Sequence, residues 1–117
     1  MRNFRELTIW NHGIDLAIKG YELARQLPKE ELYGLRSQIT RAVVSVPSNI
    51  AEGCSRSSEK DFKRFLEISL GSAFELETDL IIIEKLGFID ATVIQEYLSD
   101  LHVEQKQINS LITKIKG

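Results

Sequence analysis

The chain has 117 residues, of which 43% are hydrophobic, and a formal net charge of −2 at pH 7. This length and composition suit one hydrophobic core, so we expect a single domain over residues 1–117, and the net charge argues against a general nucleic-acid binder. The longest apolar run, residues 80–83, is too short to span a membrane, and the N-terminus has no apolar leader, which together predict a cytoplasmic protein.

The first predicted helix covers residues 9–27. Its apolar face is formed by residues spaced at three, four or seven positions, namely Ile9, Leu16, Gly20, Leu23 and Leu27. We expect this helix to end at Pro28, because proline lacks a backbone N–H and disfavours helical geometry in the residue before it.

The second predicted helix covers residues 32–53. Its apolar residues recur at steps of three and four, in the order Leu32, Leu35, Ile39, Ala42, Val43, Val46 and Ile50. Gly53 suits the C′ position that ends many helices, so we expect the helix to stop near it and a turn to follow over residues 53–57.

Pro47 lies inside this second helix. It removes the hydrogen bond to the carbonyl of Val43, at a cost of roughly 3 kcal/mol. We expect a kinked but continuous helix, in which the hydroxyls of Ser45 and Ser48 bond to some of the freed backbone groups. The alternative is a loop over residues 45–48 that joins two shorter helices.

Capping residues mark where the last two predicted helices begin and where the third ends. Ser58 is a candidate N-cap, with Asp61 three residues further on, and Gly87 is expected to end the helix that begins there. Asp90 is the candidate cap of a final helix that runs nearly to the C-terminus. Small residues at Gly71 and Ser72 would let a neighbouring backbone approach the third helix closely.

The sequence therefore predicts an all-α fold, an up-down antiparallel four-helix bundle with its second helix kinked at Pro47. Helices of about 20 to 30 residues would be about 30 to 45 Å long, which suits side-by-side packing through short connections.

Motifs for metal, cofactor or catalytic chemistry are absent from the sequence. Bundles that bind two metal ions use Glu-x-x-His pairs, but His12 follows Ile9 at that spacing and His102 follows Ser99. The single cysteine, Cys54, has no metal-ligand spacing to a second Cys or His. No nucleophile elbow or Gly-rich phosphate loop occurs. We expect no metal, no cofactor and no enzymatic activity.

A polar stripe runs beside the apolar face of the second helix, and its members also follow helical steps: Gln38, Arg41, Ser45, Asn49 and Glu52. Short amides and hydroxyls favour hydrogen bonds between helices or between subunits, whereas an ordinary solvated face is the alternative. A closed polar pocket at this stripe would instead indicate a small-molecule binding bundle or an enzyme.

Charge is distributed unevenly along the chain. Residues 36–64 contain three acidic residues and six basic ones, which are the candidate nucleic-acid contacts: Arg36, Arg41, Arg56, Lys60, Lys63 and Arg64. Residues 65–104 contain one basic residue and nine acidic ones. Complementary surfaces of this kind favour head-to-tail association of identical subunits, with pairing inside one subunit as the alternative.

Several spaced motifs resemble one known family. They are the segment from Tyr33 to Ala42, the run from Ser45 to Gly53, Phe65-Leu66, and the segment from Gly71 to Thr78. Together they resemble the bacterial four-helix bundle family associated with 23S ribosomal RNA intervening sequences, over nearly the whole chain. The resemblance implies an up-down bundle that forms a homopentamer. The family is also similar to the accessory variability determinant of diversity-generating retroelements, a basic protein that engages nucleic acid and a reverse transcriptase.

These observations lead to one functional hypothesis and one alternative. We expect a non-catalytic oligomeric scaffold, homopentameric by resemblance, that binds RNA or a ribonucleoprotein. The alternative is a protein-interaction or adaptor module that uses its acidic helices and has no nucleic-acid role.

Overall fold

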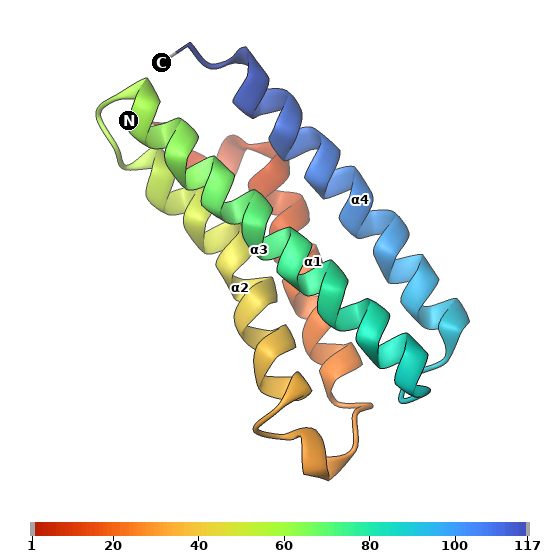
Figure 1. Ribbon diagram of the computed structural model, residues 1–117. Helices are drawn as coiled ribbons and strands as arrows, with labels where there is room; N and C mark the ends of the chain where they lie inside the picture. Colours follow the sequence, from red (N-terminus) through yellow and green to blue (C-terminus); the bar gives the residue numbers. More distant parts are fainter. Residues whose placement is uncertain (1, 117) are drawn as a thin grey trace.

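The computed structural model describes residues 2–116, which form a bundle of four α-helices (Figure 1). Its α-helices are α1 (Thr8–Ala24), α2 (Leu35–Cys54), α3 (Glu59–Leu86) and α4 (Ala91–Lys114), and two short 3-10 helices, η1 (Phe4–Glu6) and η2 (Lys29–Glu31), precede α1 and α2. The helices alternate in direction within a body of 43 × 23 × 20 Å. The predicted all-α up-down bundle is therefore confirmed.

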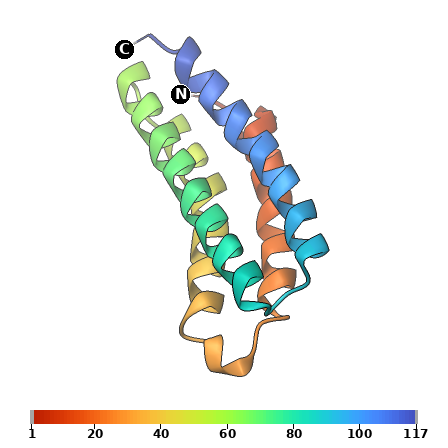
Figure 2. The same ribbon diagram turned by 45° about the vertical axis from the view of Figure 1, so that its right-hand side comes forward.

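Each helix packs against two neighbours, in the circular order α1, α2, α3 and α4, so α1 and α3 lie on a diagonal. Figure 2 shows α1 and α3 on opposite sides of the bundle. Both chain ends and the α2–α3 turn lie at one end, and the α1–α2 and α3–α4 connections lie at the other. The inward faces of the helices form one core, whose fully buried side chains include Ile39, Ile50, Phe62, Leu80, Ile94 and Leu101.

Helix α3 begins and ends where its sequence predicts. The Ser58 hydroxyl accepts a hydrogen bond from the Asp61 backbone N–H, 3.1 Å away. Gly87 follows the helix with φ of 75°, a left-handed conformation that glycine adopts without a Cβ clash. Asp90 occupies the cap position of α4, but its side chain makes no capping hydrogen bond within the described chain.

Helix α2 runs without interruption through Pro47, so the alternative of a loop over residues 45–48 is wrong. Nearby side chains hydrogen-bond to two backbone carbonyls just before this position. The Ser69 hydroxyl of α3 donates to the Val46 carbonyl at 2.8 Å, and Asn49 Nδ2 donates to the Ser45 carbonyl at 2.8 Å. The kink at Pro47 stays a prediction.

Helix α2 ends one residue after Gly53, close to where the sequence predicts, but Gly53 does not occupy the predicted C′ position. The helix continues to Cys54 and Gly53 lies in its last turn, so the turn to α3 covers only residues 55–58. A Cβ atom on Gly53 would lie 2.9 Å from the Cβ of Phe65 and 3.3 Å from the Phe62 carbonyl oxygen. The glycine is therefore needed for close packing against α3.

The small residues at Gly71 and Ser72 also differ from expectation. Gly71 is exposed, and a Cβ there would meet none of the described residues within 4 Å. The close approach predicted for Gly71 is therefore wrong within one subunit. Ser72, by contrast, contacts α2 through its hydroxyl, which lies 2.8 Å from the hydroxyl of Ser45.

Candidate nucleic-acid interface and buried polar groups

The six candidate basic residues do not form one patch. Arg36 and Arg41 lie in the first turns of α2, whereas Arg56, Lys60, Lys63 and Arg64 surround the α2–α3 turn at the opposite end of the bundle. Because α2 has 20 residues, its two ends are separated by about 30 Å. Only the four residues around the turn lie close together. We call them the turn cluster.

The side chain of Arg36 already hydrogen-bonds to the backbone of its own subunit. Its Nε donates to the Ala24 carbonyl at 3.0 Å, and its Nη2 donates to the Leu27 carbonyl at 3.1 Å. These carbonyls lie at and beyond the C-terminus of α1, where helical partners run out. The main role of Arg36 is therefore to hold the α1–α2 connection.

Arg56, Lys60 and Arg64 of the turn cluster are exposed and Lys63 is half-buried, and one aromatic ring, that of Phe65, packs against the two arginines. The guanidinium groups of Arg56 and Arg64 lie 4.7 and 4.6 Å from the centre of the Phe65 ring. Each also has a weak exposed acidic partner, Glu52 for Arg56 and Asp61 for Arg64, at 3.5 and 3.8 Å. The two lysines form no ion pair with any described residue. The cluster therefore has cationic groups free to meet phosphates.

Arg2 joins this end of the molecule, although sequence reasoning missed it. Its guanidinium lies 3.9 Å from the centre of the Phe62 ring and 2.7 Å from a Glu59 carboxylate oxygen. Its backbone N–H donates to the Cys54 carbonyl at 3.0 Å, which ties the N-terminal segment to the end of α2. These contacts join residues more than 50 positions apart, so no local pattern could have predicted them.

Charge separates along the bundle axis. We define the basic end as residues 2–14, 46–72 and 103–116, which contain nine basic and six acidic residues. The acidic end, residues 15–45 and 73–102, contains six basic and eleven acidic residues. The resulting balances of +3 and −5 make the molecule electrically polar, despite a net charge of only −2.

The polar stripe on α2 is divided between two environments. Ser45 and Asn49 are half-buried beside α3, where Ser45 meets Ser72 and Asn49 Nδ2 donates to the Ser45 hydroxyl at 2.9 Å. Gln38, Arg41 and Glu52 are exposed. The stripe thus includes one hydrogen bond between helices, while its two ends face the outside of the subunit.

A fully buried acid, Glu104, lies between α4 and α1. Its Oε1 is 3.1 Å from His12 Nδ1, and its Oε2 has no hydrogen-bond partner among the described residues. Burial raises the pKa of Glu104 to about 8. Sequence reasoning missed this group, although a signal existed: Glu104 is three residues after Leu101 and four before Ile108, both on the apolar stripe of α4.

A second buried acid, Asp79, lies on α3. Burial is the main cause that raises its pKa to about 6; the charge of Glu75 adds to the rise and that of Arg41 opposes it. Its Oδ2 has no hydrogen-bond partner within residues 2–116. Cys54 is buried as well, and burial raises the pKa of its thiol, which makes it a weak nucleophile.

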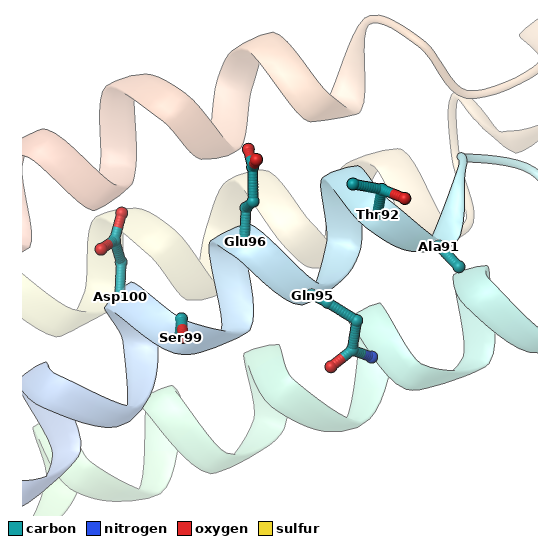
Figure 3. A pocket seen from close by; sticks show the side chains of 6 residues that line it. All are labelled: Ala91, Thr92, Gln95, Glu96, Ser99 and Asp100. Carbon is teal, nitrogen blue, oxygen red and sulfur yellow. The ribbon is translucent and has the colours of Figure 1, made fainter.

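The larger surface hollows are not lined by the polar stripe of α2. One hollow of about 700 Å³ is lined by six residues of α4 alone: Ala91, Thr92, Gln95, Glu96, Ser99 and Asp100. Figure 3 shows Glu96 and Asp100 pointing to one side of α4 and Gln95 to the other.

Among residues 2–116, no three His, Cys, Asp or Glu side chains come together as metal ligands. No helix in this range is long and apolar enough to cross a membrane.

Four antiparallel helices around one core define the chain as an all-α bundle protein. A family model described as 23S rRNA-intervening sequence protein matches residues 5–110, so the chain belongs to that family, as its motifs predicted. It is similar to a protein of unknown function from the S23 ribosomal protein family of Bacteroides thetaiotaomicron VPI-5482. The two share 24% identity over 90% of this chain and 98% of the other, with a TM-score of 0.84, which shows the same fold. No curated protein matches the chain.

Proposed function

We propose that this protein is a non-catalytic, oligomeric scaffold, homopentameric as the family resemblance implies, that binds RNA or a ribonucleoprotein at its basic end. The observation that carries the proposal is the turn cluster: Arg56, Lys60, Lys63 and Arg64 are gathered within one exposed turn and the first turns of α3. The name of the family, which refers to 23S rRNA, agrees with an RNA partner.

The chemistry of the turn cluster suits a phosphate backbone better than a specific base. Arg and Lys side chains donate readily to phosphates, and such contacts position a nucleic acid without reading its sequence. The acidic neighbours Glu52 and Asp61 form only exposed ion pairs, which contribute about 0–1 kcal/mol and can yield to a phosphate.

Oligomerisation would compensate for the small size of the cluster. One subunit offers four clustered cations, which is few for tight binding at physiological salt. In a cyclic oligomer the same four are repeated by symmetry around one rim, because every subunit has the same orientation along the axis. Contacts made by one subunit then raise the effective concentration of RNA at the next.

The test is a titration of a fluorescent structured RNA at several salt concentrations near 0.15 M. Wild-type protein should bind with an affinity that falls as salt rises, because phosphate contacts release counterions. The triple variant Lys60→Ala, Lys63→Ala and Arg64→Ala should bind at least tenfold more weakly and with a shallower salt dependence. The matched control, Lys19→Ala, Lys29→Ala and Lys85→Ala at the acidic end, removes the same charge and should bind like wild type.

Two results would overturn RNA binding through this surface: wild-type protein that shows no salt-dependent binding, or equal losses in both triple variants. The alternative function is a protein adaptor that uses the acidic end, where residues 73–102 carry seven acidic residues and one lysine. A pull-down from lysate with and without nuclease separates the two functions. Partners that survive nuclease and are lost when Glu75 and Glu84 are changed to Lys would favour the adaptor.

A further inference from the structure

A hollow lined by two tyrosine rings lies beside the α1–α2 connection. Tyr21 comes from α1 and Tyr33 from the turn that precedes α2, and Arg25, Arg36 and smaller side chains complete the lining. Its volume is about 480 Å³, within the usual range for small-molecule sites. The lining residues all come from the end of α1, the connection and the start of α2 (Figure 1). We call this the tyrosine hollow.

The ring of Tyr33 is held in the open on an ordered turn. Its side chain is 93% exposed, more than any other large hydrophobic side chain among the described residues. The turn is held by other groups: the Gly34 N–H donates to the Glu31 carbonyl at 3.1 Å, and Arg36 ties the connection to α1. A ring placed in advance on such a turn costs little conformational entropy when a flat ligand covers it. Tyr33 is therefore suited to stacking.

The charged side chains that line the tyrosine hollow are both cationic. Arg25 and Arg36 line it, and no Asp or Glu among the described residues does. Arg36 bonds to backbone carbonyls, whereas Arg25 is exposed and forms no ion pair with any described residue. Two acids are close in sequence: Glu22 lines the neighbouring hollow, and Glu31 accepts from the Leu35 N–H at 3.2 Å. This lining favours an anionic ligand.

Charge at the acidic end is unequal between its two halves. Residues 15–45, on the side of the tyrosine hollow, contain five basic and four acidic residues. Residues 73–102, in α3, α4 and their connection, contain one basic and seven acidic residues. The bundle is at least 20 Å across, which exceeds the screening length of about 10 Å at 0.1 M salt. The acidic residues of α3 and α4 therefore repel an anion at the hollow only weakly.

Aromatic rings beside a guanidinium group match a ligand that carries both a flat ring system and a negative charge. Nucleobases stack on aromatic side chains, and arginine donates to phosphates. We propose that the tyrosine hollow binds one unpaired nucleotide, with its base stacked on Tyr33 and its phosphate held by Arg25. The nucleotide is either free or an unpaired residue of an RNA strand. This site lies at the opposite end of α2 from the turn cluster, so the inference stands without the proposed function.

The test measures the binding of a fluorescent eight-nucleotide single-stranded RNA at several salt concentrations from about 0.05 M. Tyr33→Ala should weaken binding at least about fivefold with an unchanged salt dependence, because stacking releases no counterions. Arg25→Ala should also weaken binding, but with a shallower salt dependence. Tyr33→Phe keeps the ring and should bind like wild type. The control Phe74→Ala removes a ring of α3 that is 54% exposed and should have no effect.

The same variants in the background of the turn-cluster triple variant separate this inference from the proposed function. Binding that survives loss of the turn cluster and still depends on Tyr33 would support the tyrosine hollow by itself. Binding that disappears with the turn cluster and is unchanged by Tyr33→Ala would overturn the hollow and leave the proposed function intact. Wild-type protein that binds no single-stranded RNA and no AMP would overturn the nucleotide site.

Two further measurements identify the ligand and its position. Displacement of the strand by AMP would assign the hollow to a free nucleotide, whereas displacement by unlabelled strand alone would assign it to a residue within RNA. A proline-rich peptide, which also binds aromatic-lined grooves, would overturn the nucleotide assignment if it bound with the same dependence on Tyr33. Irradiation of a strand that contains 4-thiouridine should cross-link it to Tyr33 or Tyr21, as located by mass spectrometry. Cross-links confined to the turn cluster would contradict the inference.

Discussion

The seam between α1 and α4 and the seam between α2 and α3 hold the bundle together by different means. Close approach defines the α2–α3 seam, where Gly53 admits Phe65 and the Ser69 hydroxyl donates to a backbone carbonyl of α2. The α1–α4 seam depends on individual polar contacts between distant residues. Tyr97 donates to the Leu16 carbonyl at 2.6 Å, and His12 meets Glu104.

The buried acids on the two sides of the molecule show what the difference means. Asp79, on α3, has the cation Arg41 near enough to lower its pKa, which burial and Glu75 raise to about 6. Burial raises the pKa of Glu104, in the α1–α4 seam, to about 8. At pH 7 Asp79 is therefore mostly ionised, whereas Glu104 is mostly protonated and shares a hydrogen bond with His12 Nδ1. The α2–α3 side of the bundle therefore carries a buried charge, and the α1–α4 seam carries a neutral acid.

The largest predicted effect is on the pH dependence of stability. Folding raises the pKa of Glu104 from its ordinary 4.5 to about 8, so between these values the folded state holds a proton that the unfolded state has lost. Stability contributed by this proton is complete below about pH 4.5 and is lost as pH rises through 8, by up to about 1.4 kcal/mol per pH unit. Glu104→Gln should flatten this fall, as measured by urea denaturation at pH 5, 6.5 and 8.

Asp79→Asn is the matched control for the other buried acid. Because the pKa of Asp79 reaches only about 6, this variant should flatten the profile below that pH and leave the fall between pH 6.5 and 8 unchanged. Identical profiles for wild type and Glu104→Gln above pH 6.5 would contradict a protonated Glu104.

Gly53→Ala should break the close approach of α2 and α3. The new Cβ would lie 2.9 Å from the Cβ of Phe65, so the helices must separate, at a cost of about 1–3 kcal/mol in the free energy of unfolding. Gly71→Ala is the control, since it adds a Cβ in open space on an exposed helix position and should stabilise by about 0.5–1 kcal/mol. Urea denaturation measures both, and changes of the same sign would contradict the packing role of Gly53.

Single hydrogen bonds in the two seams should have similar, smaller effects. Ser69→Ala removes the hydroxyl donor to Val46, and Tyr97→Phe removes the hydroxyl donor to Leu16; each should lower the free energy of unfolding by about 1 kcal/mol. The sites share no hydrogen-bond partner, so the double variant should be additive within about 0.5 kcal/mol. A larger departure in denaturation measurements would show that the seams are coupled.

The smallest effect is expected at the exposed ion pair between α1 and α4. Lys19 Nζ lies 3.4 Å from an Asp100 carboxylate oxygen, with both side chains about half exposed. Lys19→Ala or Asp100→Ala should change the free energy of unfolding by less than about 0.5 kcal/mol, because water screens such pairs. A loss above 1 kcal/mol would mean that the α1–α4 seam depends on this pair.

The sequence by itself determined the helices, their approximate ends and the family. Apolar period and the signals at Ser58 and Gly87 act within one or two turns, so they can be read without knowing the neighbours. The residues around the α2–α3 turn were also found as candidates, because they are close in sequence. The grouping of Arg36 and Arg41 with these residues was wrong, because both lie at the other end of α2.

Tertiary structure alone decided the roles of residues whose partners are distant in sequence. Gly53 suits a helix end locally, yet it lies inside the last turn of α2, where its missing Cβ leaves room for Phe65 of the next helix. Glu104 would be an ordinary surface acid if His12, 92 residues away, and the core around it did not bury it. Burial, and with it a raised pKa, depends on which segments pack together, and local backbone preferences carry no information about that choice.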